Sequence, residues 1–523
     1  MNEPLPSFAC QVLSNRPGWR SIVACEVLFL VVLACVVYGY RLGTGGLINT
    51  EGHRVAPAWE MLDTGEIWTQ RLFGQIYLRK PPGHAWAIAL STLAVGRNEW
   101  APRLVGALSG VGMVLLAYFF ARRWFGTTAG LPAGLAQLLM PIFWKFQRSA
   151  EIEGLLNLLS QMVILATLEI LLCPRDRDRI RHVVFMSMAT LGFVLGFLVK
   201  GPAIAAVWGG SLIAVVSLKG FWSVIGSRPF WMMFLTSFFA VGTGMATIAH
   251  FASASHEEIV LERVFGFEWS WSILAGMLLL IPKAIVLALP GSFALLAPWM
   301  SARETPGRGM ALGVAIASIA SVLIFMLVGL TNERYTVPAF TVVSLLVGFA
   351  WSARSSWELS RNAERWGRTL AGALGVLLVV GWMGYVGLME ARLRATSGKE
   401  QGFQLARILP DGATLWSDGM IDARPETLLY AQMAAKNTGK KLTVRWRHQP
   451  SEKLPLPDVG GYVLLRTDGV DSERDRHRDT PGLSCVTTGK VYKYPFELLH
   501  VESPSSPINA MSIAPRPVDQ LVR

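Results

Sequence analysis

The sequence predicts a mainly α-helical, polytopic membrane protein with a small α/β domain at its C-terminal end. Of its 523 residues, 52% are hydrophobic and only 16% are charged, and the mean hydropathy is +0.40. A soluble domain usually carries about 25% charged residues. Residues 391–523 reach that share with 19 basic and 15 acidic side chains, whereas residues 1–390 hold only 29 and 21. We therefore expect a membrane domain over 1–390 and a soluble domain over 391–523.

Apolar stretches of about 20 residues are long enough to cross a bilayer whose hydrocarbon core is about 30 Å thick. We expect about 11 to 13 spans, and eleven can be placed: 22–40, 101–121, 126–143, 154–173, 183–199, 201–218, 230–250, 271–297, 310–330, 335–351 and 367–389. The apolar stretch 83–95 is too short to cross and is expected at the membrane interface.

Loop charge gives the expected orientation. Cytosolic loops collect Lys and Arg, and the cluster at 175–181 holds four arginines. This topology explains the net charge of +12, so no nucleic-acid partner is expected. An odd number of spans with a cytoplasmic N-terminus makes 41–100 and 144–153 external loops and puts the soluble domain outside the cytoplasm.

The soluble domain has the pattern of a small α/β unit. Residues 414–416, 442–446 and 461–466 are predicted strands, and 426–435 has helical spacing. The charge-rich segment 472–480 is expected to be a loop, and the last twenty residues, with four prolines, are expected to be loose.

The first external loop is rich in basic residues, which opposes the usual charge bias of outer loops. It contains Arg54, Arg79 and Lys80, together with Glu51, His53 and Tyr77. A bound phosphate would explain such cations, because Arg and Lys donate charge-assisted hydrogen bonds to it. The alternative is a solvated loop whose charges pair with each other.

Further polar residues are expected at the same outer ends of the spans. Glu151 and Glu153 precede an apolar helix, where acids also favour the helix dipole. Two carboxylates at this place suit proton abstraction or metal coordination. Lys200 lies in a hairpin, where it either snorkels or binds a ligand. Arg334 and Tyr335 begin a span, where arginine can clamp a phosphate.

The need for a metal or nucleotide is not established by these patterns. His and Glu residues at 250–263 lack a specific ligand spacing, so a divalent cation is left open and no cofactor is certain. No cysteine cluster, Walker loop or dinucleotide fingerprint occurs. The reaction is therefore not expected to use ATP directly.

In their order along residues 40–350, these motifs resemble the GT-C glycosyltransferases that use polyprenyl-phosphate sugars. The resemblance is strongest to the bacterial lipid A aminoarabinose transferases and the protein O-mannosyltransferases. It rests on Glu51-Gly52-His53-Arg54, Tyr77 to Gly83, Arg103-Leu104, the acids Glu151 and Glu153, Lys200-Gly201, and Arg334 to Pro338. Two departures occur: Glu51 replaces an aspartate of the family, and Gly52 replaces its second acid.

The resemblance implies a multi-pass protein of the bacterial inner membrane. It would move a sugar from undecaprenyl phosphate to a lipid, glycan or protein acceptor at the periplasmic face, in contact with membrane lipids, by an inverting displacement. The implied catalytic acids are Glu51, Glu153 and Glu151. The implied donor-phosphate ligands are Arg54, Lys80, Lys200, Arg334 and Tyr335, and His53, Tyr77 and Arg79 would bind substrate.

Two other classes of function compete with this one. A transporter or flippase of polyprenyl-linked lipids would also need outer cations, but not the paired carboxylates, and the repeated halves common in transporters are not found. A membrane-anchored binding module would place the activity in residues 391–523, which offer no evident catalytic constellation.

Overall fold

The structure, a computed structural model, describes residues 19–48, 50–77, 79–173, 179–252, 282–283, 285–327, 333–354, 361–417, 419–446, 460–467, 482–491 and 493–502. The chain forms two compact units. The helical unit comprises Met1–Leu42, Leu78–Ala87 and Pro102–Tyr385, and the polar unit comprises Gly43–Tyr77, Ile88–Ala101 and Val386–Arg523. The boundary at 390 predicted from charge stays a prediction.

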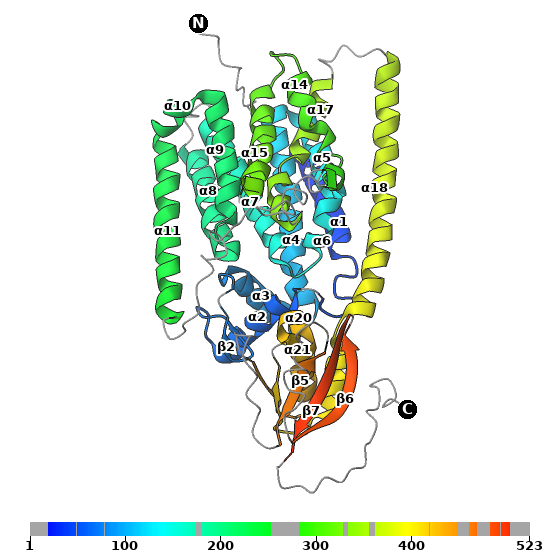
Figure 1. The fold of residues 1–523 in the computed structure, drawn as a ribbon. Helices are drawn as coiled ribbons and strands as arrows, with labels where there is room; N and C mark the ends of the chain where they lie inside the picture. The colour runs from blue at the N-terminus through cyan, green and yellow to red at the C-terminus, as the bar shows by residue number, and fades with distance from the viewer. Residues whose placement is uncertain are drawn as a thin grey trace. The chain divides into compact units, whose positions relative to one another are not determined.

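Figure 1 shows the main helices of the helical unit. They are α1 (Trp19–Gly39), α4 (Trp100–Phe125), α5 (Gly130–Leu139), α6 (Pro141–Gln147), α7 (Ile152–Leu172), α8 (Arg179–Lys200), α9 (Ala203–Lys219), α11 (Arg228–Ala252), α15 (Arg308–Leu327), α17 (Ser344–Ala353) and α18 (Arg361–Thr396). Shorter helices are η1 (Thr127–Ala129), α10 (Phe221–Ile225), η2 (Phe293–Leu296), α14 (Ala297–Met300), α16 (Glu333–Thr336) and η3 (Val337–Phe340). Helix α3 (Gly83–Val95) and the ends of α4 and α18 continue into the polar unit.

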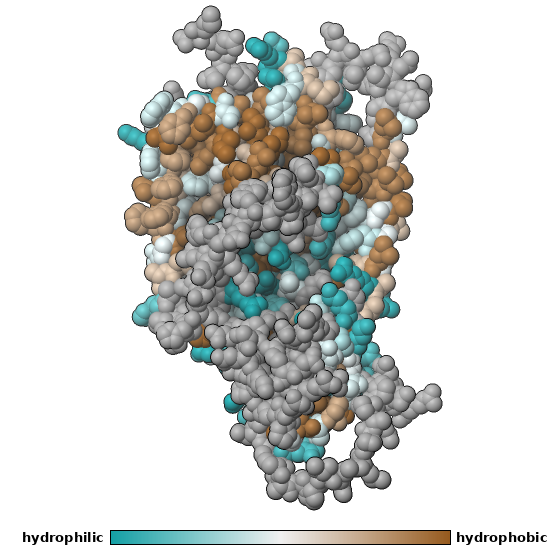
Figure 2. Space-filling model, viewed as in Figure 1, coloured by the Kyte–Doolittle hydropathy of each residue, from teal (hydrophilic) through white to brown (hydrophobic). Residues whose placement is uncertain are grey.

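Within the described residues, eight helices are long and apolar enough to cross a membrane. Many of their apolar side chains face outward, including Leu191 (54% exposed), Phe238 (63%) and Leu377 (66%). Figure 2 shows such hydrophobic side chains, in brown, over much of the visible face of the helices. Exposed apolar surface on this scale requires lipid rather than water around it. The predicted mainly α-helical, multi-pass membrane fold is confirmed.

Three expected spans do not form one continuous helix of about 20 residues. The expected span 126–143 is not one continuous helix, because it is divided among η1, α5 and α6. Pro141 opens α6 and the preceding Met140 is extended, as residues before proline usually are. Helix α9 has 17 residues, and 335–351 is divided among α16, η3 and α17. Residues 271–281 and 284 of the expected span 271–297, and the whole of the segments 472–480 and 504–523, lie outside the described residues.

The core of the helical unit forms where α9 packs on α15 and α7 on α8. Gly210 of α9 permits the first of these contacts. A Cβ atom there would lie 2.8 Å from the Ala317 carbonyl oxygen of α15. The backbones therefore approach closely, as small residues allow between membrane helices.

The polar unit contains a five-stranded sheet in the order β4-β3-β5-β7-β6. Its strands are β3 (Thr414–Trp416), β4 (Thr443–Arg445), β5 (Tyr462–Arg466), β6 (Leu483–Val491) and β7 (Tyr494–Val501). Strand β3 is parallel to β4 and β5, with Leu415 opposite Val444 and Tyr462, whereas β7 is antiparallel to β5 and β6. The unit also holds α2 (Gly52–Thr64), β1 (Arg71–Leu72), β2 (Gln75–Ile76), α19 (Lys399–Ile408), α20 (Gly419–Ala423) and α21 (Pro425–Asn437).

Most predicted elements of the soluble domain are confirmed. Strands were expected at 414–416, 442–446 and 461–466, where β3, β4 and β5 occur, and the helix at 426–435 is α21. The small α/β class is therefore correct. The prediction lacked β6, β7, α19 and α20, so it contained only three of the five strands.

Candidate active site

The start of α7 carries the two acids predicted in the second external loop. Glu151 is the extended N-cap residue, and Glu153 lies in the first turn with an exposed fraction of 3%. The next residue, Gly154, packs against α4, since a Cβ atom there would lie 3.0 Å from the Cα of Gly106. This tight packing holds Glu153 in a buried position, where an isolated charge would be costly.

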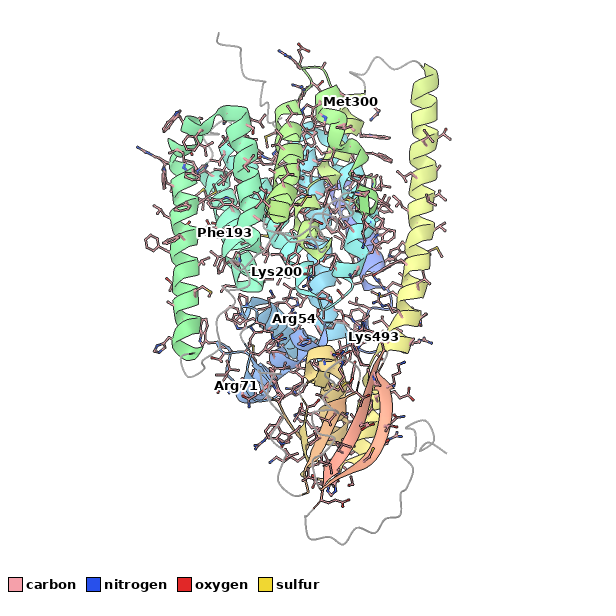
Figure 3. The ribbon with its side chains drawn as sticks, viewed as in Figure 1. Arg54, Arg71, Phe193, Lys200, Met300 and Lys493 are labelled. Atoms are coloured by element: carbon pink, nitrogen blue, oxygen red, sulfur yellow. The ribbon has the colours of Figure 1, made fainter. Side chains whose placement is uncertain are left out.

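Lys200 at the end of α8 provides the opposite charge (Figure 3). Its Nζ lies 2.7 Å from Oε1 of Glu153, and both side chains are 4% exposed. The chain then turns at Gly201, whose φ of +64° favours glycine. A buried ion pair of this kind requires both members, because removal of one strands the other charge.

The segment before η3 adds an aromatic ring and a second cation. Nζ of Lys200 lies 4.4 Å from the ring centroid of Tyr335. The Arg334 guanidinium lies 5.1 Å from the same centroid and donates a hydrogen bond of 3.4 Å to the Tyr335 hydroxyl. Both distances are typical of cation–π contacts. The Tyr335 ring therefore contacts two cations, Lys200 at the end of α8 and the neighbouring Arg334.

Arg334 also interacts electrostatically with Glu151 and Glu153. Five residues predicted from separate motifs thus gather in the helical unit. Arg334, Tyr335 and Glu151 are half-buried, whereas Glu153 and Lys200 are buried. Because Glu153 is already paired with Lys200, Arg334 is the cation of this cluster that is better exposed to an anionic ligand.

The segment with Lys80 leads into this region of the helical unit. Lys80 is half-buried and Arg79 is exposed, just before α3. Gly83 lies against the end of α8, where a Cβ atom would be 2.7 Å from the Leu198 carbonyl oxygen. His84 Nε2 is 3.1 Å from the Ala150 carbonyl oxygen, directly before Glu151. Sequence reasoning did not single out His84, which is 2% exposed.

In the polar unit, Glu51 is the residue before α2 and is only 1% exposed. Its Oε2 accepts a 2.9 Å hydrogen bond from the Ile48 amide. Two residues on, the His53 ring stacks on Tyr77 with centroids 6.2 Å apart, and both side chains are buried. Arg54 is half-buried in the first turn of α2. The structure therefore brings Glu51, His53, Arg54 and Tyr77 into one unit.

Glu426, a buried charged residue in the first turn of α21, lies beside Gly52. A Cβ atom at Gly52 would be 2.7 Å from the Glu426 amide nitrogen and 3.0 Å from its Oε2. Glu426 is fully buried and its Oε1 accepts a 2.8 Å hydrogen bond from Arg424, which is 4% exposed. Burial raises the pKa of Glu426 to about 7, an effect that Arg424 opposes and Glu51 reinforces.

Sequence reasoning missed both Glu426 and Arg424. Glu426 opens the predicted helix 426–435, where a glutamate usually serves the helix dipole from the surface. Nothing in the local pattern shows that this residue packs on a segment more than 370 positions earlier. The one available signal was Gly52, which stands where the glycosyltransferases that the motifs resemble have an acid.

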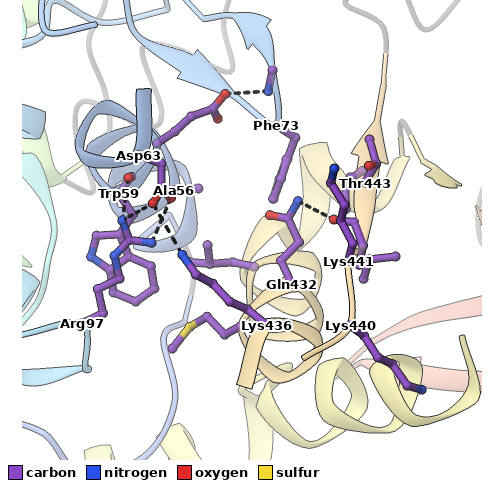
Figure 4. Close-up of a pocket in the computed structure, with 16 residues that line it drawn as sticks. Ala56, Trp59, Asp63, Phe73, Arg97, Gln432, Lys436, Lys440, Lys441 and Thr443 are labelled. Carbon is purple, nitrogen blue, oxygen red and sulfur yellow. Dashed lines mark hydrogen bonds and ion pairs between the residues drawn. The ribbon is translucent and has the colours of Figure 1, made fainter. Parts of the chain in front are cut away.

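A cleft of about 530 Å³ lies elsewhere in the polar unit, between α2, α21 and β4 (Figure 4). Trp59 and Phe73 contribute apolar surface to it, and Lys436 and Lys441 contribute charge. Asp63 in the cleft is held by Arg97 at 2.7 Å. A cleft of this size with mixed lining is typical of small-molecule sites.

Metal ligation has no support among the residues that the structure describes. No group of three or more His, Cys, Asp or Glu side chains in those residues could hold a metal ion. His250 lies in the last turn of α11, but most of the 250–263 segment lies outside the described ranges. The divalent cation left open by the sequence stays untested.

A family model described as dolichyl-phosphate-mannose-protein mannosyltransferase matches residues 79–250. The undecaprenyl phosphate-alpha-4-amino-4-deoxy-L-arabinose arabinosyl transferase of Pseudomonas savastanoi pv. phaseolicola is 29% identical over 33% of this chain and 32% of its own length. The polyprenol-phosphate-mannose–protein mannosyltransferase of Mycobacterium tuberculosis is 26% identical over 38% of this chain and 36% of its own length. The alignments thus span about a third of these relatives.

The crystal structure of ArnT from Cupriavidus metallidurans resembles nearly the whole chain. Its apo form has a TM-score of 0.71 at 18% identity, covering 93% of this chain and 100% of ArnT. The form bound to undecaprenyl phosphate has a TM-score of 0.70 at 19% identity. At this identity the likeness establishes a shared fold, and it agrees with the resemblance predicted from the motifs.

Proposed function

We propose that this chain, which shares the fold of ArnT, is a membrane glycosyltransferase that transfers a sugar from an undecaprenyl-phosphate donor to a lipid, glycan or protein acceptor. One observation carries the proposal. Glu153, Lys200 and the pair Arg334 and Tyr335 come from three helices, α7, α8 and α16, and gather in one cluster. This combination of acids and cations suits a reaction that removes a proton and releases a phosphate.

The proposed reaction is a single displacement with inversion at the anomeric carbon. The acceptor hydroxyl oxygen forms a bond to that carbon while the bond from the carbon to the phosphate oxygen breaks. The acceptor proton goes to a carboxylate, and undecaprenyl phosphate leaves with the bonding electron pair. Glu51 is the first choice for the base, because Glu153 is engaged by Lys200. Glu151 is the remaining acid.

Cations would stabilise the charge that develops on the leaving phosphate. We assign this role first to Arg334 and Lys80, which are half-buried and therefore reachable. Arg54 is proposed as a further phosphate ligand of the same type. Lys200 and Tyr335 are also proposed as phosphate ligands, and the Tyr335 ring lies between the Lys200 and Arg334 cations in contact with both. His53, Tyr77 and Arg79 are proposed to contact the substrates.

The proposed site opens toward the periplasm of the bacterial inner membrane. The support is the charge of the loops. The arginine-rich segment 175–181 is typical of a cytosolic loop, and the site residues are predicted at the opposite ends of the spans. The sugar donor would then be used on the face where the acceptor is located.

The proposal predicts that Glu51→Gln lowers sugar transfer about 100-fold or more, the usual contribution of a general base. Purified wild-type protein is incubated with radiolabelled undecaprenyl-phosphate sugars and membrane extract, and label is followed into lipid, glycan and protein fractions. Glu66→Gln is the matched control, because Glu66 lies in the same loop but is exposed and pairs with Arg71.

The assay also separates the competing functions. Normal transfer by Glu51→Gln would remove Glu51 from the role of base. Movement of intact labelled lipid across a proteoliposome membrane, without cleavage of the sugar phosphate bond, would replace the transferase proposal with a transporter.

A further inference from the structure

Helix α21 places a second carboxyl group beside Gly52, the residue that follows the proposed base. Glu426 is fully buried, and its Oε2 lies 3.0 Å from where a Cβ atom of Gly52 would be. Gly52 follows Glu51 in the chain. The absence of a side chain at 52 therefore leaves the space that the Glu426 carboxyl group fills.

The hydrogen bonds of Glu426 are incomplete. Arg424 donates to Oε1 at 2.8 Å, whereas Oε2 is buried and has no hydrogen-bond partner. A buried carboxylate oxygen without a partner is unfavourable, and such groups are rare unless they serve a function. A surface helix cap explains neither the burial of Glu426 nor the orientation of its second oxygen toward the Glu51 segment.

The same helix also holds the segment that leads to Glu51. One turn after Glu426, the Tyr430 hydroxyl accepts a 2.8 Å hydrogen bond from the Leu47 amide and donates one of 3.0 Å to Glu99. Glu99 in turn pairs with Lys399 at 2.6 Å. Helix α21 thus contacts the chain on both sides of Glu51, through Tyr430 at Leu47 and through Glu426 at Gly52.

We propose that Glu426 is a positioning residue: its buried carboxyl group packs against the segment of Glu51 and, while it is protonated, holds that segment in place without repelling Glu51. The inference rests on the proposed function of Glu51. It makes the C-terminal part of the chain a component of the active site rather than an accessory domain. An uncharged carboxyl group beside Glu51 adds no like-charge repulsion to that side chain, whereas an ionised one does.

The electrostatic surroundings agree with this role of Glu426. Burial raises the pKa of Glu426 to about 7, and Glu51 adds to the rise while Arg424 opposes it. Other charged groups near Arg424 surround the Tyr494 ring, which Arg424, Arg466 and Lys493 face at 5.9, 4.5 and 5.3 Å. Near pH 6, Glu426 therefore holds its proton, and above pH 8 it loses it.

The test measures kcat for sugar transfer between pH 5.5 and 9 in the full-length protein. In the wild type, kcat should fall severalfold as pH rises through about 7, because ionised Glu426 repels Glu51 and loosens its position. Glu426→Gln mimics the protonated form. It should keep kcat within about twofold of the wild type at pH 6 and remove the fall at higher pH.

Further variants separate positioning from folding. Tyr430→Phe should lower kcat severalfold with an unchanged KM for the donor, whereas Tyr462→Phe and Glu400→Gln, which alter side chains of the same unit away from α2, should match the wild type. Glu426→Asp serves as a second variant if Glu426→Gln fails to fold, and it should retain the titration with a lower kcat.

Distinct outcomes overturn the two proposals. If the wild type transfers no sugar, or Glu51→Gln is fully active, the proposed function or base fails. If Glu51→Gln is inactive but Glu426→Gln keeps the wild-type pH profile, or Tyr430→Phe keeps the wild-type kcat, the role of α21 is wrong and the proposed function remains.

Discussion

At the scale of the residue, the pair of Glu153 and Lys200 is a deeply buried ionic contact of the helical unit. Its atoms are 2.7 Å apart and both side chains are almost fully buried. A buried pair contributes little net stability relative to apolar residues, but loss of one member leaves an unpaired charge. The pair therefore explains why a lysine is found in an apolar hairpin without being exposed.

We predict that Glu153→Gln destabilises the protein by about 3 to 5 kcal/mol and that Glu153→Leu with Lys200→Met recovers most of the loss. Thermal unfolding in detergent measures both. Arg394→Ala, which breaks an exposed pair with Glu390 in α18, should cost less than about 1 kcal/mol. Equal losses in the single and double variants would mean that packing, not charge pairing, controls this position.

At the scale of the element, α21 determines which residues α2 tolerates at its start. Gly52 lies against the Glu426 backbone, which cannot move aside as a flexible side chain would. Glycine is common at the start of a helix. Here it is required because α2 packs closely against α21, which is far away in the sequence.

Gly52→Ala should therefore lower stability by about 1 to 3 kcal/mol, the usual effect of overpacking. It should also reduce sugar transfer, because the shift displaces Glu51. Gly387→Ala is the control: it lies within α18 with open space around it, and alanine there should be neutral or slightly stabilising. A Gly52→Ala protein with wild-type melting temperature and activity would contradict the close packing.

At the scale of the whole molecule, orientation in the membrane decides whether the proposed site can reach its substrates. We predict that alkaline phosphatase fused after residue 446 is active in a bacterial host and that fusion within 175–181 is inactive, because the enzyme folds only outside the cytoplasm. Green fluorescent protein fusions at the same positions should give the opposite pattern. An inactive phosphatase after residue 446 would place the polar unit in the cytosol.

Local sequence was enough to predict the membrane class, the bounds of α3, strand β3, and the charged residues in the segments between the predicted spans. These features depend on local composition and periodicity, which need no knowledge of distant contacts. Tertiary structure alone decided that Glu153 is paired with Lys200, that one expected span is divided among η1, α5 and α6, and that Glu426 lies beside Gly52. Pairing and burial depend on segments hundreds of positions apart, and the energy of a buried charge depends on those partners.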